Sequence, residues 1–399
     1  MIWDFLQFYV TAYPALLCAW VVLLALLQVL CRESSTAVPT GVGGLSVAIL
    51  VPARNEELVL TECLEALLTT DWPHTEIHVL SDGSTDGTEE IARSFASRGV
   101  RLAASAVNRG KSEVLEEALA ALTSDLVMVV DADTRLDPRA VREMVALFAT
   151  ERVGGATANI RVSEASSFLA RLQQMEYASI IGLLKRANGF WGGLFTVSGA
   201  AACFRVAAVR AVGGFRSTSA TEDIDLSWRL QRDGWRLAYA PRAHVSVRVP
   251  ERLPALWRQR RRWSQGLVEV LRLQGDVWRH RSLVLLPFIG EALASILWAF
   301  LLAATLPVFL GQWIATGGRS VLVTEFWSWL AFSMAMFLVQ SITAWVLDDH
   351  YRRQSPWLLL LAIFYPGYFL VVVFPCGLAG WVSGLFSHHA ARWERTARE

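Results

Sequence analysis

Long apolar segments at both ends of the chain set the strongest limit on how it can fold. Residues 5–30 form an apolar run long enough to cross a bilayer as one helix, which takes about 20 residues. Further apolar runs occupy 283–310, 326–347 and 357–386. With 54% hydrophobic residues, the chain holds more apolar side chain than one soluble core needs. We therefore expect a polar middle part held between membrane helices.

The N-terminal run is expected to remain as an anchor and not to be removed as a signal peptide. No basic segment precedes it, and Leu30-Cys31-Arg32 follows it in place of a small-residue cleavage site. Pro14 can kink the helix. The first positive side chain, Arg32, comes after the span. The positive-inside rule, by which basic residues flank a span on its cytoplasmic side, therefore places the N-terminus outside and the next domain in the cytoplasm.

The last apolar run leaves two topologies open. Prolines and glycines interrupt 357–386, so this run either crosses the bilayer once or forms a broken hairpin. The arginines at 352–353 fit a cytoplasmic loop before it. A single crossing would leave the basic tail, 389–399, outside, against the positive-inside rule.

Net charge and cysteine usage argue against two classes of protein. A net charge of +1 gives no electrostatic reason to expect nucleic acid as a partner. The five cysteines form no CxxC pair and lie mostly in apolar contexts, which indicates neither a zinc site nor a disulfide framework. We expect reduced, buried thiols.

The middle part is expected to form an α/β domain with a parallel sheet, because strand-like and helical patterns alternate. The predicted strands are 45–52, 76–80, 101–104 and 125–130, and the predicted helices are 56–68, 88–97 and 111–122. Ligands bind beyond the carboxyl ends of the strands in such sheets. The polar motifs of this chain begin at those ends, which favours a nucleotide-sugar site.

Motifs after the first two predicted strands are candidates for base contacts. The first runs from Pro52 through Asn55 to Glu56, for which helix capping by Asn55 is the alternative. The second, from Ser81 to Gly87, is similar to a calcium loop. Its twelfth position, counted from Asp82, is arginine where an EF-hand needs glutamate. Asp82 is therefore a candidate acceptor for a base N–H, and Asp86 for capping the next helix.

The third motif, Asn108-Arg109-Gly110-Lys111, is a candidate for binding a diphosphate. Glycine permits close backbone approach, and Lys111 supplies a point charge. A solvated helix start is the alternative.

Asp131 and Asp133 follow a strongly apolar strand. In an extended segment, residues two apart share one face, so the two carboxylates would repel each other unless a positive group lies between them. A hard divalent cation such as Mg²⁺ or Mn²⁺ meets that need and neutralises a leaving diphosphate. The pair is therefore a predicted metal site.

The acidic group Thr221-Glu222-Asp223 is a candidate for proton transfer. An acceptor hydroxyl must lose its proton as it attacks an anomeric carbon, and a carboxylate within hydrogen-bond reach can take it. We assign this role to Asp223. Capping by Thr221, with the acidic residues in the first helical turn, is the alternative and does not exclude catalysis.

Two amphipathic helices are expected on the membrane surface. In 168–186, Phe168, Leu172, Met175 and Leu183 share an apolar face, with Arg171, Gln174 and Lys185 opposite. In 253–272, the apolar stripe contains Leu256, Trp263, Leu267 and Leu271, with Arg258 and Arg261 pointing away. Helical spacing places Gln259, Arg262 and Trp263 next to one another on the helix surface. The guanidinium of Arg262 could bind pyrophosphate through two N–H groups, and the Trp263 ring could stack on a sugar. A basic helix on anionic lipid is the alternative.

These motifs, in this order, resemble those of the processive family 2 glycosyltransferases, which have the GT-A fold. The chain is most like the bacterial members that make poly-β-1,6-N-acetylglucosamine, over about residues 47–266. The most specific segments are Ile180 to Arg186, Phe195 to Gly199, Thr221 to Asp225 and Gln259 to Gly266.

The resemblance implies an inverting hexosyltransferase that uses UDP-N-acetylglucosamine with Mg²⁺ or Mn²⁺. It implies donor-binding roles for Pro52, Asn55, Glu56, Asp82, Lys111, Asp131 and Asp133, the last two also holding the metal. It implies catalytic roles for Asp223 and Glu222. The acceptor and product side would contain Ser198, Gly199, Gln259, Arg262 and Trp263.

The resemblance also implies a location and partners. The enzyme would be a multi-pass protein of the bacterial inner membrane that exports a biofilm exopolysaccharide. A small membrane partner subunit is implied, and any activation by cyclic di-GMP would act through it, because this sequence shows no appended regulatory domain. The expected parts are an anchor (1–33), a linker (34–45), a GT-A domain (46–250), an interface helix (251–280), a C-terminal membrane region (281–388) and a basic tail (389–399).

Other functions stay open. A chitin-type or hyaluronan-type synthase would keep the chemistry and change the sugar or linkage. Gln259-x-x-Arg262-Trp263 argues against one-step transfer to a lipid phosphate. The intact carboxylates Asp131, Asp133 and Asp223 argue against a non-enzymatic scaffold.

Overall fold

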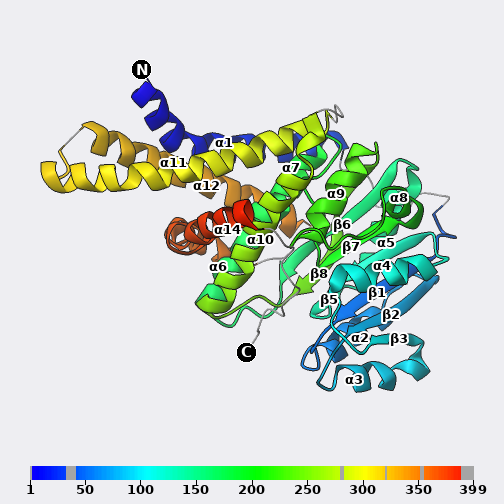
Figure 1. Cartoon of the computed structure of the whole chain (residues 1–399). Coiled ribbons are helices and arrows are strands. Elements are labelled where there is room, and N and C mark those ends of the chain that lie inside the picture. The colour runs from blue at the N-terminus through cyan, green and yellow to red at the C-terminus, as the bar shows by residue number, and fades with distance from the viewer. Residues whose placement is uncertain (1, 33–41, 279–282, 320, 351–354, 388–399) are drawn as a thin grey trace.

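The computed structural model describes residues 2–32, 42–278, 283–319, 321–350 and 355–387. Figure 1 shows an α/β part at one end of an elongated molecule and long helices at the other. The chain begins in the long helices, passes through the α/β part and returns to the helices. This order agrees with the expected polar middle part between apolar helices.

Within the described residues, a mixed sheet of eight strands forms the centre of the α/β part, in the order β3-β2-β1-β4-β7-β6-β8-β5. The strands are β1 (Val47–Ala53), β2 (Thr75–Asp82), β3 (Val100–Ser105), β4 (Leu126–Val130), β5 (Thr134–Leu136), β6 (Val153–Val162), β7 (Ala201–Arg205) and β8 (Arg236–Val247). The pairs β3–β2, β2–β1 and β1–β4 are parallel, whereas β7 is antiparallel to β4 and β6. The predicted parallel arrangement is confirmed for these first four strands.

Helices between the first strands cover the sheet. They are α2 (Leu60–Leu68), α3 (Thr88–Ser94), η1 (Ala96–Arg98) and α4 (Lys111–Ala121), followed by α5 (Ala140–Val145), η2 (Ala146–Ala149) and α8 (Val206–Ala211). Strands β1 and β4 are buried along their whole length, as expected where helices cover both faces of a sheet. Burial of these apolar strands explains why the sequence pattern located them.

The first helix begins at Leu60 and not at residue 56. Asn55 has a φ of 55°, a left-handed backbone conformation that interrupts any helix there. Its side-chain oxygen accepts from the backbone N–H of Thr85 at 2.8 Å and so connects the end of β1 to the loop after β2. The alternative interpretation of Asn55 as a helix cap is therefore wrong.

Strands beyond residue 130 are not predicted by the sequence patterns. Strand β6 contains Gly154 and Gly155, which have low strand propensity. A Cβ at Gly154 would lie 2.7 Å from the Cβ of Trp235, and one at Gly155 would lie 2.9 Å from Leu237 Cδ2. Close packing by neighbouring side chains therefore requires glycine in this strand.

The first predicted amphipathic helix is present as α6 (Phe168–Glu176), a π-helical segment η3 (Tyr177–Gly182) and α7 (Leu183–Gly189). Leu172, Met175 and Leu183 are buried as predicted, but Phe168 is 55% exposed. Lys185 is buried, so its predicted place on the solvent side is wrong. The reason is that α7 contacts the N-terminal helix as well as β8, which leaves it no open face there.

The second amphipathic helix is α10 (Leu253–Leu273), with η4 (Gly275–Trp278) after it. Leu256 is buried and Arg258 and Arg261 are exposed, as predicted. The last helix, α14 (Phe374–Phe386), packs against α10 through glycine. A Cβ at Gly380 would lie 2.5 Å from the backbone oxygen of Arg261, so the two helices are in close backbone contact.

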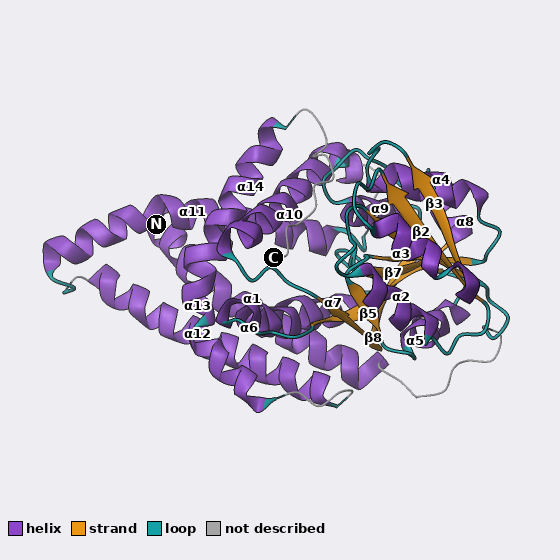
Figure 2. Ribbon diagram, turned by 90° about the horizontal axis from the view of Figure 1, so that it is seen from below, coloured by secondary structure: helices purple, strands orange, loops and turns teal. Residues whose placement is uncertain are grey.

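The long apolar helices are α1 (Ile2–Arg32), α11 (Leu286–Thr316) and α12 (Val321–Asp349). The last run contains η5 (Pro356–Ile363), α13 (Tyr365–Tyr368), η6 (Phe369–Val373) and α14. Four helical runs in the described residues are long and apolar enough to cross a membrane: Phe8–Cys31, Leu286–Thr316, Thr324–Asp349 and Tyr365–Phe386. Figure 2 shows α11 and α12 extending away from the sheet.

The last apolar run is divided at residue 364. Segment η5 lies against α6 and α12, and only Tyr365–Phe386 has the length and composition of a span. This arrangement favours one crossing over a hairpin. The arginines at 352–353 and the basic tail lie outside the described residues.

The cysteines are all unbridged. Cys63, Cys203 and Cys376 are buried as expected, and burial raises the pKa of the Cys63 thiol to about 12. Cys31 is exposed, so the expectation of buried thiols is wrong for this residue.

Candidate active site

Lys111 lies between carboxylates from two other elements. Its Nζ is 2.8 Å from Asp131 Oδ1 and 2.8 Å from Glu222 Oε1. Lys111 begins α4, Asp131 follows β4, and Glu222 begins α9 (Glu222–Arg232). Burial disfavours the charged amine, but the two carboxylates outweigh this effect and raise the pKa of Lys111 above its ordinary value. The structure thus joins three predicted motifs around one stable positive charge.

Asp131 and Asp133 lie in a turn and not in an extended segment. Thr134 donates its backbone N–H to Asp131 O at 3.0 Å, which reverses the chain after β4. The Asp131 side chain is 36% exposed and faces Lys111, whereas Asp133 is 7% exposed. The predicted alternation along a strand is therefore wrong, although both residues remain at the end of β4.

Asp223, the predicted base, lies beside this cluster. Its Oδ2 accepts from the backbone N–H of Gly199 at 3.1 Å. A Cβ on Gly199 would lie 3.2 Å from that oxygen and 3.7 Å from Lys111 Nζ, so the three residues meet at one point. Burial and the neighbouring charge of Glu222 raise the pKa of Asp223 to about 6. A carboxyl with this pKa is ionised at neutral pH and is more basic than an ordinary aspartate.

Thr157 on β6 supports the turn that contains Ser198 and Gly199. Ser198 donates its backbone N–H to Thr157 Oγ1 at 2.9 Å, and Lys185 Nζ donates to the same oxygen at 3.3 Å. Burial lowers the pKa of Lys185 to about 8, and the charge of Asp223 partly opposes this effect. Lys185 therefore places a buried amine close to the predicted base.

The acidic motif is held in place by α10 and not by a capping side chain. Thr221 makes no side-chain hydrogen bond to the start of α9, so the predicted cap at Thr221 is wrong. Its hydroxyl lies against Gly266, where a Cβ would be 2.4 Å from Thr221 Oγ1. Ala220 donates its N–H to Glu269 Oε2 at 2.8 Å. The absence of a side chain at Gly266 thus allows α10 to contact the acidic motif directly.

Arg262 on α10 lies next to the same motif. Its Nη1 donates to Ala220 O at 3.4 Å. Burial raises the pKa of Glu222, but the charges of Lys111 and Arg262 outweigh this effect and hold that pKa below its ordinary value. Arg262 and Lys111 therefore both lie near Glu222.

Gln259 and Trp263 lie on the same helix. Gln259 is 7% exposed, and its side-chain oxygen accepts no hydrogen bond from the described residues. The Arg260 guanidinium lies over the Trp263 ring, 4.5 Å from the ring centroid. This cation–π contact fixes the ring that was predicted to stack on a sugar.

The pair Arg260–Glu176 is a part of the site that the sequence patterns did not identify. The two side chains are 2.8 Å apart and 8% and 6% exposed, and the hydroxyl of Tyr368 lies 3.4 Å from Glu176 Oε2. Glu176 follows Leu172 by four residues, so it lies on the apolar side of α6. A charge on an apolar helix face was the available signal, since such a charge needs a buried partner.

The residues that were predicted to contact the nucleobase instead hold two loops in place. Asp82 is fully buried, and its two carboxylate oxygens accept from the backbone N–H groups of Arg109 and Gly110 at 2.7 and 2.8 Å. It therefore positions the loop before Lys111 and offers no surface to a base in this conformation. Glu56 donates its backbone N–H to the Thr88 hydroxyl at 2.8 Å. Contact of Asn55, Glu56 or Asp82 with a base stays a prediction.

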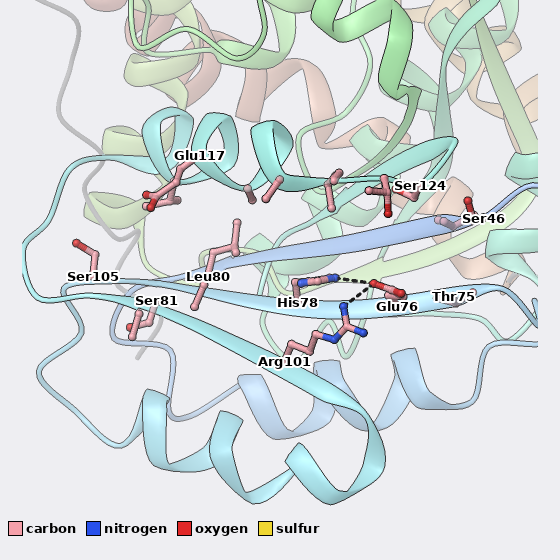
Figure 3. A pocket seen from close by; sticks show the side chains of 18 of the residues that line it. Ser46, Thr75, Glu76, His78, Leu80, Ser81, Arg101, Ser105, Glu117 and Ser124 are labelled. Atoms are coloured by element: carbon pink, nitrogen blue, oxygen red, sulfur yellow. Dashed lines mark hydrogen bonds and ion pairs between the residues drawn. The ribbon is translucent and has the colours of Figure 1, made fainter.

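A separate groove of about 780 Å³, lined by both polar and apolar residues, lies along β2, β3 and α4 (Figure 3). His78, Glu76 and Arg101 form linked contacts in it, with Arg101 donating to Glu76 at 2.8 Å. Lys111 and Asp223 are not among the residues that line it. This groove is therefore distinct from the cluster of predicted catalytic residues.

Asp131 and Asp133 fit a divalent cation only together with oxygens from a ligand. The described residues contain no group of three or more His, Cys, Asp or Glu side chains arranged to hold a metal. Mg²⁺ is commonly bound by one or two carboxylates together with substrate phosphates, and Mn²⁺ also prefers oxygen ligands. The aspartate pair fits this mode of binding.

Comparisons with known proteins agree with this geometry. A family model described as glycosyltransferase-like family 2 matches residues 44–266. The poly-β-1,6-N-acetyl-D-glucosamine synthase of Staphylococcus epidermidis RP62A is 31% identical over 342 residues, which cover 82% of this chain and 80% of the relative. The synthase of the same name from Staphylococcus aureus COL is 34% identical over 258 residues, covering 64% and 63%.

Among solved structures, the mannosyltransferase PcManGT from Pyrobaculum calidifontis, in complex with GDP-mannose and Mn²⁺, is similar with a TM-score of 0.55. It is 21% identical, and the match covers 86% of this chain and 98% of that one. The likeness supports the fold alone.

The fold, the site and these matches define a glycosyltransferase with helices that could span a membrane. The chain belongs to the glycosyltransferase-like family 2. The resemblance seen in the sequence and the expected GT-A fold are confirmed.

Proposed function

We propose that this chain polymerises N-acetylglucosamine from UDP-N-acetylglucosamine into poly-β-1,6-N-acetylglucosamine and exports the product as it grows. The observation that carries the proposal is the match to the Staphylococcus epidermidis synthase over 82% of this chain and 80% of the relative. The position of Asp223 beside Lys111 supports it, because a polymerase needs a base next to the donor diphosphate.

On the donor side, Lys111 binds the diphosphate, which Arg262 contacts from the product side, and the loops with Pro52, Asn55 and Asp82 adjoin the nucleoside. Asp131 and Asp133 would hold Mg²⁺ or Mn²⁺, which neutralises the leaving diphosphate when bound. A diphosphate at Lys111 would compete with Asp131 and Glu222 for the amine, which now contacts both at 2.8 Å. Donor binding therefore rearranges ion pairs that already exist.

On the acceptor side, Asp223 takes the proton of the acceptor hydroxyl as its oxygen attacks the anomeric carbon. The new carbon–oxygen bond forms while the bond to the diphosphate breaks, so UDP leaves and the configuration inverts. Glu222 keeps Lys111 in place through their ion pair. The turn at Ser198 and the α10 residues Gln259 and Trp263 form the product side.

An export path is proposed through the long helices. A cavity of about 490 Å³ lies between α1, α11, α12 and α14, and its lining includes Ser264, the neighbour of Trp263. The rings of Trp298 and Trp381 also line it and could contact sugar faces. We place the GT-A domain, 46–250, in the cytoplasm of a bacterium and the spans in its inner membrane.

The expected regulation completes the proposal. A small membrane subunit would assist synthesis, and cyclic di-GMP would act through that subunit. The interface helix (251–280) and the C-terminal membrane region (281–388) are the parts of this chain that such a subunit could contact.

The test is incorporation of radiolabelled UDP-N-acetylglucosamine into polymer by membranes that contain the chain, with and without a candidate partner subunit. Asp223→Asn should abolish incorporation and leave UDP binding unchanged. Asp233→Asn, at the exposed far end of the same helix, is the matched control and should keep full activity. Polymer made by Asp223→Asn would refute the base assignment.

Linkage-specific hydrolases then identify the product. Polymer that is cut by a β-1,6-specific hexosaminidase and resists chitinase supports the proposal. The reverse pattern would assign the chain to the chitin class, and incorporation that also requires a uronic acid donor would assign it to the hyaluronan class.

A further inference from the structure

A pocket of about 750 Å³ lies where the sheet meets the interface helices, apart from the catalytic cluster. Its walls come from β5, β6, β8, α6 and η5. Three arginines line it: Arg135 on β5, Arg161 on β6 and Arg171 on α6. The proposed function assigns no role to these arginines or to this pocket.

Arginines outnumber carboxylates among the residues that line the pocket, although Glu62 and Asp348, which lie outside the lining, also pair with Arg135 and Arg161. Glu164 is the one carboxylate among its lining residues, and it lies 3.6 Å from Arg135 with 75% of its side chain exposed. Arg161 lies 3.7 Å from Asp348 at the end of α12. Arg171 donates through Nε to Ala165 O at 3.4 Å, and no carboxylate of the described residues is within 4.0 Å of it.

Neutral hydrogen-bonding groups accompany the arginines. Gln174, Ser163, Ser246 and Ser355 also line the pocket. Guanidinium, amide and hydroxyl groups together can bind the oxygens of a phosphate from several directions. The pocket therefore has the chemistry to hold a phosphate ester.

Large apolar side chains adjoin the arginines on the side of the long helices. Trp357 lines the pocket and is 74% exposed, and Phe364 at the end of η5 is 55% exposed. Phe364 contacts Phe168 of α6 edge to face, with ring centroids 5.7 Å apart. Tryptophan is enriched where a membrane meets water, and exposed apolar rings of this kind are stabilised by acyl chains.

We propose that this pocket binds the headgroup of an anionic phospholipid from the cytoplasmic leaflet. The arginines contact the phosphate, and Trp357, Phe364 and Phe168 contact the acyl chains. A soluble phosphate would leave these rings in water, which is why we assign the ligand to a lipid. Basic pockets beside membrane helices on the cytoplasmic side are suited to such headgroups.

The site would connect lipid to the donor side of the enzyme. Arg135 lies two residues after Asp133, on the short strand β5 that pairs with β8. Arg161 reaches from β6 to the last turn of α12. A bound headgroup would give both arginines a further negative partner beside Glu62, Glu164 and Asp348.

The test measures lipid retained by the purified full chain, independently of its activity. The chain is released for native mass spectrometry from micelles that contain equimolar phosphatidylglycerol and phosphatidylcholine. Wild type should retain phosphatidylglycerol in preference to phosphatidylcholine. Arg171→Gln should lower the retained phosphatidylglycerol about fivefold, since each arginine at a membrane surface contributes about 1 kcal/mol to binding an anionic lipid. Arg171→Lys keeps the charge and should retain most of the lipid.

The matched control is Arg258→Gln, which removes the same charge from an exposed position on α10 outside the pocket. It should retain lipid like wild type. Equal retention of the two lipids by wild type, or equal losses in Arg171→Gln and Arg258→Gln, would overturn the proposal. So would unchanged retention in Arg171→Gln.

Inorganic phosphate, added to the wild-type sample, distinguishes a lipid from a soluble ligand. Retained phosphatidylglycerol should resist phosphate. Its full displacement, with phosphate bound to the chain instead, would assign the pocket to a soluble phosphate and refute the lipid assignment.

Discussion

Mild acid should slow sugar transfer by protonating one carboxyl, Asp223. Burial and the charge of Glu222 raise the pKa of this group from 3.8 to about 6. Protonation removes the acceptor for the hydroxyl proton, so activity should fall as the pH falls through the pKa of Asp223. The ionised fraction is about 90% at pH 7 and about 10% at pH 5 for a pKa near 6, and above about 90% at both pH values for an ordinary aspartate. We therefore expect kcat/KM to fall roughly tenfold between pH 7 and pH 5.

The assay is the initial rate of radiolabelled sugar incorporation by membranes across this pH range. UDP binding measured at each pH shows whether the loss of rate comes from weaker donor binding or from protonation of Asp223. Samples returned from pH 5 to pH 7 must recover their rate, which excludes irreversible unfolding. Glu222→Gln removes the like charge beside Asp223, while Lys111 keeps its ion pair with Asp131, so the acid limb of the profile should move to lower pH. A flat profile between pH 7 and pH 5, or a limb that moves to higher pH in Glu222→Gln, would refute this account of Asp223.

Three other predictions concern residues around the base. Lys185→Met removes a positive charge that faces Asp223, so the acid limb of the kcat/KM profile should move toward neutral pH; an unchanged limb would show that Lys185 does not act on the base. Gly266→Ala places a Cβ 2.4 Å from Thr221 Oγ1 and should lower kcat by displacing the acidic motif, whereas Gly275→Ala, with no atom within 4 Å, should keep the wild-type rate. Glu176→Gln leaves Arg260 buried without its charged partner and should destabilise the fold by about 3–5 kcal/mol, seen as a lower unfolding midpoint. Glu65→Gln in the exposed pair with Arg98 is its control, and equal effects of the two substitutions would contradict the reasoning.

The donor half of the site could be predicted from the sequence because its signals are local. Strands β1, β2 and β4 are apolar runs, and the motifs that follow them begin where the strands end. Parallel pairing brings those ends to one edge of the sheet, so the order of motifs was enough to place Asp131 near Lys111. Local conformation was harder to predict, since Asn55 accepts a hydrogen bond from the loop after β2 and Asp131, where the local turn begins, donates its N–H to Ala200 O at 3.1 Å.

The acceptor half could be predicted only in part because its contacts are long-range. Lys185 was placed on the wrong side of its helix because periodicity does not show that α1 covers the other face. The partner of Arg260 is 84 residues away on α6, and nothing in the local pattern around either residue identifies the other. Glycine-containing β6 was missed for the same reason, since side chains from distant elements, Trp235 and Leu237, occupy the space beside Gly154 and Gly155.

The two halves of the site are therefore stabilised by different parts of the molecule. On the donor side, Asp131 and Lys111 belong to elements of the sheet domain. On the proposed acceptor side, Trp263 lies against Arg260, whose partner Glu176 also lies near Tyr368 of the last apolar run. Removing the partners of a buried ion pair is costly, so we expect the proposed acceptor surface to be better ordered when the last apolar run packs against α6 and α10. Glu176 and Arg260 thus connect the proposed acceptor surface to the last apolar run, and under the proposed function we expect sugar transfer to depend on how that run packs against α6 and α10.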